Sequence, residues 1–133
     1  MTPDEVRDRE LVRDLVARYA RALDTRDWGA LTQCFTADAQ AEFSGVRLEP
    51  GAEAIVRHLR QLESVTASTH LTGNILMDFD ADGALVESQA LVHLALDQGV
   101  RVRGVFYSDR LVRVDGAWRI QERRHRAGWS VDI

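Results

Sequence analysis

The chain contains a single cysteine, Cys34, so no intrachain disulfide can form. It lacks any apolar stretch long enough to span a bilayer, and no apolar run of the kind found in secretory signals follows its acidic start. Its 17 Lys and Arg residues are outnumbered by 21 Asp and Glu residues and form no basic block, which argues against a nucleic-acid-binding surface. These absences predict a cytoplasmic protein that binds neither nucleic acid nor membrane.

The sequence patterns of metal, nucleotide and serine-hydrolase sites are also missing. The four histidines are dispersed, without a His-x-x-x-His pair or acidic residues at ligand spacing. No glycine-rich loop joins a strand to a helix, and no Gly-x-Ser-x-Gly elbow occurs. Cys34, beside Leu31 and Phe35 on an expected helix, is predicted to be a buried small side chain. The sequence therefore predicts no metal and no cofactor.

The length of the chain fits one domain, residues 1–133, with one hydrophobic core. Thr2, Pro3 and Glu5 make the pattern of a capping box at the start of a helix. Apolar residues then recur at helical spacing as far as Leu23, which places Tyr19 on the inward side. The chain therefore begins with one long amphipathic helix.

Two shorter helices and a weak strand are expected to follow. A second helix begins after the capping residue Asp27, and a third begins after Pro50 and Gly51. Residues 39–43 alternate weakly as a strand, and Gly45 breaks the pattern. The buried faces of the two helices are expected to be Trp28, Leu31 and Phe35, and Ile55, Leu59 and Leu62.

From Ser68 onward, the sequence has the turns of an antiparallel meander. Turn residues at 80–83, 97–99 and 115–116 separate four segments of about a dozen residues, longer than the usual strand. Helices followed by such a sheet indicate an α+β domain. We expect a cone-shaped curved antiparallel sheet, covered by three helices from the N-terminal half, with room for a pocket inside.

Tyr19, Asp24 and His70 are the candidate catalytic residues. A phenol, a carboxylate and an imidazole suffice for proton transfer without a metal. Asp24 lies near a helix C-terminus, where the helix dipole opposes its charge, so another group is expected to hold it. Five helical residues rotate by about 500°, so Tyr19 shares a pocket with Asp24 only if the chain leaves the helix before Asp24. Tyr19 as a core residue and His70 as an ordinary strand histidine are the alternatives.

Several segments together resemble a known family. They are residues 19–28, residues 34–39, His70 with Asn74, and residues 107–120. In order and spacing they resemble the SnoaL-like group of the nuclear-transport-factor-2-like superfamily, in the branch of scytalone dehydratase and bile-acid 7α-dehydratase. The resemblance implies a cystatin-like α+β barrel. It leaves the activity open, because the fold hosts isomerases, dehydratases, cyclases, epoxide hydrolases and binding modules.

The resemblance also implies catalytic positions. Asp24 and His70 match an Asp and a His that the dehydratases of this branch share with hexachlorocyclohexane dehydrochlorinase. Tyr19, five residues before Asp24, matches a catalytic tyrosine of the bile-acid enzyme. Leu23 stands where scytalone dehydratase has a tyrosine, so that enzyme's full pattern is absent and its particular substrate is not expected.

Further substrate-binding residues are expected on the sheet. His93 is a looser match to a second catalytic histidine, and lining a pocket or plain packing both fit its strand position. Asn74 and Tyr107, within the resembling segments, are expected to contact substrate. Strand alternation suggests Arg124 as an inward cation for a substrate carboxylate or leaving group, or as a structural partner of Glu122 or another acid.

The expected function is a cofactor-independent elimination, a dehydration of a hydrophobic cyclic substrate that is steroid-like or polyketide-like. His70 would take a proton from carbon, Asp24 would orient the imidazole, and Tyr19 would donate a hydrogen bond. A ketosteroid-isomerase-like isomerase or a polyketide cyclase is one alternative. For the isomerase the general-base position holds Phe43, with Glu42 one residue off.

A non-catalytic small-ligand-binding or scaffold dimer is the other alternative. It expects a shallow or filled cone with Tyr19, Asp24 and His70 apart, whereas elimination expects the three to converge at the base of a closed, mainly apolar pocket. In either case the uncovered outer sheet face is expected to pair with another copy, as a dimer or a trimer.

Overall fold

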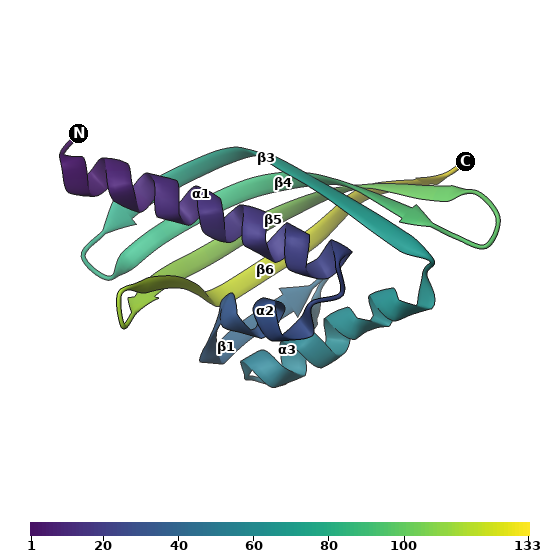
Figure 1. Cartoon of the computed structure of the whole chain (residues 1–133), viewed down its shortest axis with the longest axis horizontal. Coiled ribbons are helices and arrows are strands. Elements are labelled where there is room, and N and C mark those ends of the chain that lie inside the picture. Colours follow the sequence, from purple (N-terminus) through teal and green to yellow (C-terminus); the bar gives the residue numbers. More distant parts are fainter.

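The computed structural model describes all residues, 1–133, and confirms the α+β cone (Figure 1). Long strands form a curved sheet, and the first helix crosses its concave face. The helices are α1 (Pro3–Asp24), α2 (Trp28–Gln33), α3 (Ala52–Leu59) and the 3₁₀ helix η1 (Arg60–Ser64). The strands are β1 (Phe35–Phe43), β2 (Val46–Arg47), β3 (Ala67–Asp80), β4 (Gly83–Ala95), β5 (Val100–Val114) and β6 (Ala117–Asp132).

The six strands lie in the order β2-β1-β6-β5-β4-β3. Strands β3 to β6 form the expected antiparallel meander of four long strands. The sheet is mixed, however, because β1 runs parallel to β6. A parallel neighbour requires a long crossover, which α3 and the meander provide here. The second helix is also shorter than expected, since Phe35 begins β1.

Helix α1 begins as the sequence predicts. The Thr2 hydroxyl accepts a hydrogen bond from the Glu5 amide, and the Glu5 carboxylate accepts one from the Thr2 amide. The helix continues without interruption to Asp24. The inward face of α1 packs on β3, and Val12, Leu15, Tyr19 and Leu23 belong to the core.

Strand β4 shows which face of the sheet is inward. Val86, Ser88 and Val92 are buried against the helices, whereas the residues between them face outward. His93 is one of the outward residues and is exposed. It therefore lies outside the cone, and the expectation that it lines an interior pocket is wrong.

A β-bulge in β6 changes which residues face inward. On β5, Arg110 and Leu111 are consecutive, but their partners on β6 are Glu122 and Ile120, so Gln121 is an extra residue. Before the bulge Ile120 is buried, and after it Arg123 is buried.

The bulge corrects the expectation for Arg124. Its side chain is 73% exposed on the outer side, where Nε lies 3.2 Å from Glu42 Oε2. Arg124 is therefore not the inward cation; it forms a surface ion pair. None of the helices is long and apolar enough to cross a membrane.

Candidate active site

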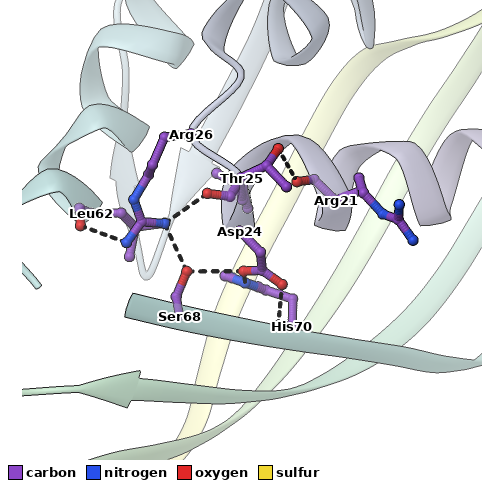
Figure 2. Close-up of polar contacts among 8 residues, drawn as sticks. Arg21, Asp24, Thr25, Arg26, Leu62, Ser68 and His70 are labelled. Atoms are coloured by element: carbon purple, nitrogen blue, oxygen red, sulfur yellow. Dashed lines mark hydrogen bonds and ion pairs between the residues drawn. The ribbon is translucent and has the colours of Figure 1, made fainter. Parts of the chain in front are cut away.

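Asp24 and His70 form a close pair where the end of α1 meets β3 (Figure 2). His70 Nδ1 lies 2.7 Å from Asp24 Oδ1, and the His70 backbone amide donates to Asp24 Oδ2 at 2.7 Å. The Ser68 hydroxyl donates to Asp24 Oδ1 at 2.9 Å. These donors hold a carboxylate that the helix dipole disfavours, as expected from the sequence.

The pairing determines which nitrogen of His70 is available for chemistry. Because a carboxylate accepts from Nδ1, that nitrogen carries the proton of the neutral ring and Nε2 keeps its lone pair. Nε2 has no hydrogen-bond partner in the chain, and it is not among the buried unpartnered atoms. His70 therefore presents an accessible, unprotonated nitrogen, as a general base must.

Burial and the neighbouring charges act on His70 in opposite directions. Its side chain is 7% exposed and that of Asp24 is 21% exposed. Desolvation lowers the pKa of His70 below its ordinary value, and the charges of Arg26 and Arg123 lower it further. The hydrogen bond and charge of Asp24 oppose this shift. The net lowering keeps the ring neutral, and so able to accept a proton, at pH 7.

Arg26 supports the Asp24–His70 pair through Ser68. Its guanidinium donates to the Ser68 hydroxyl at 2.8 Å, to the Leu23 carbonyl at 2.7 Å and to the Leu62 carbonyl at 3.0 Å. Figure 2 shows this chain of contacts from Leu62 through Arg26 and Ser68 to Asp24. Sequence reasoning missed Arg26 and Ser68 because the contacts of Arg26 with Ser68 and Leu62, and of Ser68 with Asp24, join residues that are distant in the chain.

A cleft of about 420 Å³ between α1 and β3 reaches the pair. Its walls combine small and apolar side chains with polar groups near Asp24 and His70. The lining includes Val16, Ala17, Ala20, Arg21, Thr72 and Ile75. The cleft is open to solvent, so a small molecule can approach His70 without any rearrangement of the fold.

Tyr19 does not line this cleft. Because α1 continues through Asp24, the rotation between the two residues directs Tyr19 into the core. There its ring packs edge-on against Phe35 and Tyr107, and burial raises its pKa. The structure thus brings together two of the three predicted catalytic residues and leaves Tyr19 apart from them.

The interior of the cone holds a buried ion pair that the sequence did not reveal. Arg123 donates to both Asp109 oxygens at 2.8 Å, and its guanidinium carbon lies 4.2 Å from the ring centres of Tyr19 and Tyr107. Asp109 follows Tyr107 at strand spacing, which was a usable signal. The inward position of Arg123 depends on the bulge and had no such signal.

Several interior polar atoms have no partner in the chain. They are Arg123 Nη1, Ser88 Oγ and His125 Nδ1. Ser88, Tyr107 and His125 lie in one row across β4, β5 and β6. Tyr107 is buried in the interior and does not line the cleft at Asp24 and His70; its expected contact with substrate stays a prediction.

Asn74 lies on the opposite side of the sheet. It occupies a register shift in β3 with a positive φ of 50°, and its amide donates to Gln89 Oε1 at 2.7 Å on the outer face. Asn74 therefore contacts neither the cleft nor the interior. No three His, Cys, Asp or Glu side chains are grouped as a metal site requires.

Comparison with known proteins identifies relatives over nearly the whole chain. A family model described as a SnoaL-like domain matches residues 4–124. An uncharacterised protein of Mycobacterium tuberculosis is 28% identical over 124 residues, which cover 90% of this chain and 84% of that protein. A solved protein of unknown function from the same organism is 34% identical, with a TM-score of 0.80, and covers 88% of this chain and 74% of its own.

Two further solved structures share the fold at low identity. A candidate scytalone dehydratase from Novosphingobium aromaticivorans has a TM-score of 0.91 at 22% identity, covering 100% of this chain and 92% of its own. A type 3 hexachlorocyclohexane dehydrochlorinase from Novosphingobium barchaimii has a TM-score of 0.87 at 19% identity, covering 98% of this chain and 92% of its own. At these identities the likeness establishes the fold alone.

Proposed function

The chain belongs to the SnoaL-like domain family of the nuclear-transport-factor-2-like superfamily, and from this premise we propose that it is a cofactor-independent lyase. The reaction is an elimination, a dehydration of a hydrophobic cyclic molecule that is steroid-like or polyketide-like. The single observation that carries the proposal is the Asp24–His70 pair, with Nδ1 bonded to a carboxylate and Nε2 free at a cleft.

The proton transfer follows from the pair. His70 Nε2 removes a proton from the carbon next to the one that bears the hydroxyl group, and Asp24 stabilises the imidazolium that forms. The electron pair of the broken C–H bond becomes the new C=C bond as the C–O bond breaks. The imidazolium returns its proton to the departing hydroxide, so the products are the alkene and water.

The cleft supports a small, largely apolar substrate. Val16, Ala17, Ala20 and Ile75 offer contact to a ring system, and a volume of about 420 Å³ lies within the usual range for small-molecule sites. Two structural neighbours are named for a dehydratase and a dehydrochlorinase, both eliminations. The proposal gives Tyr19 no part in the proton transfer, because Tyr19 does not line the cleft.

The isomerase alternative finds less support. Its general base would stand at Phe43, which is buried against His58 and His125, while the neighbouring Glu42 is paired with Arg124 on the outer side. No carboxylate therefore occupies the inward position on β1.

Ligand binding without catalysis is the second candidate. The observation that favours it is the separation of Tyr19 from Asp24 and His70, together with the Arg123–Asp109 pair that fills part of the cone. Under this alternative, His70 and Asp24 would only line the cleft.

The two candidates are separated by a screen of cyclic β-hydroxy ketones, with the conjugated enone product followed by absorbance. We expect turnover by the wild type and a loss of at least 100-fold in His70→Gln, because the base is removed. His93→Gln, which removes an exposed histidine from the outer face, is the matched control and should keep full activity. Binding of a ketone without turnover, unchanged in His70→Gln, would favour the ligand-binding candidate.

A further inference from the structure

A second and larger cavity lies on the other flank of α1. It is a groove of about 630 Å³ between α1, α2 and the turn that joins β5 to β6. The side chains of α1 that line it are Leu11, Asp14, Leu15, Arg18, Arg21 and Ala22, and only Arg21 and Thr25 border both this groove and the Asp24–His70 cleft. Nothing in the proposed elimination uses this groove.

The floor of the groove is apolar and well packed. Leu15, Ala22, Cys34 and Trp118 are each buried and belong to the core, so the floor is a fixed surface of the fold. An apolar body lying there would be removed from water, which is favourable by about 25 cal/mol per Å² of buried apolar surface.

Three arginines border the floor, and two of them lack a carboxylate partner. Arg18 lies 3.4 Å from Asp14, but neither Arg21 nor Arg119 has a carboxylate within 4.0 Å. The remaining acid of the groove, Asp27, accepts the Ala30 amide at the start of α2. Two cations are therefore left uncompensated in a chain whose net charge is −4.

Arg119 is the more informative of the two cations. It is half-buried, its Nε is sealed from solvent without any hydrogen-bond partner, and its only side-chain bond is from Nη2 to Gln33 Oε1 at 3.1 Å. Arginine side chains that lose water contact are normally paired, because an unpaired buried charge is costly. The positive field also extends to the floor: burial raises the pKa of the Cys34 thiol to about 11, against the charges of Arg123, Arg18 and Arg119.

We propose that this groove is a binding site for an amphipathic carboxylate, whose apolar body lies on Leu15, Cys34 and Trp118 and whose carboxylate pairs with Arg119 and Arg21. A carboxylate accepts hydrogen bonds from two guanidinium nitrogens at once, which suits an arginine with free donors. The volume is sufficient for a phenyl or naphthyl ring with a short chain. The site is independent of the Asp24–His70 chemistry.

Backbone NMR spectra recorded during titration with 4-phenylbutyrate, and in parallel with its neutral amide, test the proposal. We expect saturable shifts at Gln33, Cys34 and residues 116–119, and binding of the amide at least tenfold weaker. Arg119→Gln should weaken 4-phenylbutyrate binding at least tenfold. Arg7→Gln, which makes the same charge change at an exposed position of α1 outside the groove, should leave binding unchanged.

A second variant keeps the test decisive if Arg119→Gln fails to fold. Ala30 lines the groove from the exposed side of α2, so Ala30→Trp should fill it and abolish the shifts. The proposal is overturned by an absence of saturable shifts, by shifts that map to the α1–β3 cleft instead, or by equal binding of the acid and the amide.

Discussion

His125 is a histidine whose protonation the folded state resists. Its ring lies between Phe43 and Tyr107, with centre-to-centre distances of 4.8 and 5.6 Å. Burial, followed by the charge of Arg123, lowers its pKa to about 4, with smaller contributions from Arg103 and His58 in the same direction. His125 is therefore neutral at pH 7, and its Nδ1 stays in the interior without a partner.

This shift makes stability depend on pH. The unfolded chain binds a proton at His125 near pH 6.5, whereas the folded chain does so only near pH 4. As the pH falls through this window the unfolded state is favoured, and the free energy of unfolding falls by about 3 kcal/mol in total. Urea unfolding at pH 7 and at pH 4.5 should show that the free energy of unfolding falls less on acidification in His125→Phe than in the wild type.

His93→Gln is the control for this comparison, because it removes an exposed histidine on the other side of the sheet. Its free energy of unfolding should fall between pH 7 and pH 4.5 by as much as that of the wild type. An equal loss in His125→Phe and the wild type would show that His125 titrates alike in the folded and unfolded chains.

The C-terminus of α1 connects a local backbone feature to the site. Arg26 follows the capping residue Thr25 with a positive φ of 57°, and the Asp27 amide bonds to the Ala22 carbonyl as in a Schellman motif. Glycine is the usual residue at this position, since a side chain makes the left-handed conformation costly. Here the three hydrogen bonds from the Arg26 side chain offset that cost and hold Ser68 beside Asp24.

Two substitutions at this position separate the backbone from the side chain. Arg26→Gly and Arg26→Ala both remove the three hydrogen bonds, but only glycine relieves the left-handed backbone. We expect both to be less stable than the wild type, and Arg26→Gly to be more stable than Arg26→Ala by about 1 kcal/mol in urea unfolding. Equal stability of the two variants would indicate that the helix end rearranges once the side chain is lost.

Elements whose signals are local in the chain could be predicted from the sequence. The capping box at Thr2 and Glu5 and the turn at Asp115 depend on neighbours three residues apart or fewer. The bulge at Gln121 could not, because it depends on how β6 pairs with β5. Asp24 and His70 are also distant in the chain, so their pairing was predicted only through the family resemblance. No resemblance pointed to Arg123, and its inward position was not predicted.

At the scale of the whole molecule, the outer face of the sheet remains uncovered by helices. Exposed apolar side chains gather there along β3, β4 and β6, including Leu71, Leu76, Leu85, Leu91 and Trp129. Patches of this kind on a small domain mark interaction sites. We propose that this face pairs with a second copy of the chain, as a dimer or a trimer.

Light scattering coupled to size-exclusion chromatography tests the assembly. We expect a species of at least twice the monomer mass at high micromolar concentration, and a shift toward monomer in Leu91→Glu, because a buried unpaired carboxylate opposes the interface. Val6→Glu, at an exposed apolar position of α1, should leave the assembly unchanged. A monomer at every concentration would remove the proposal.

The pairing of His70 with Asp24 is tested most directly by the imidazole nitrogen NMR signals of His70, assigned by their loss in His70→Gln. At pH 7 we expect a protonated Nδ1 and an unprotonated Nε2. In Asp24→Asn the pKa of His70 should fall further, because the substitution removes the carboxylate that opposes, in the wild type, the lowering caused by burial. A proton on Nε2 in the wild type, or a tautomer and pKa unchanged in a folded Asp24→Asn protein, would contradict the assignment of His70 as a base oriented by Asp24.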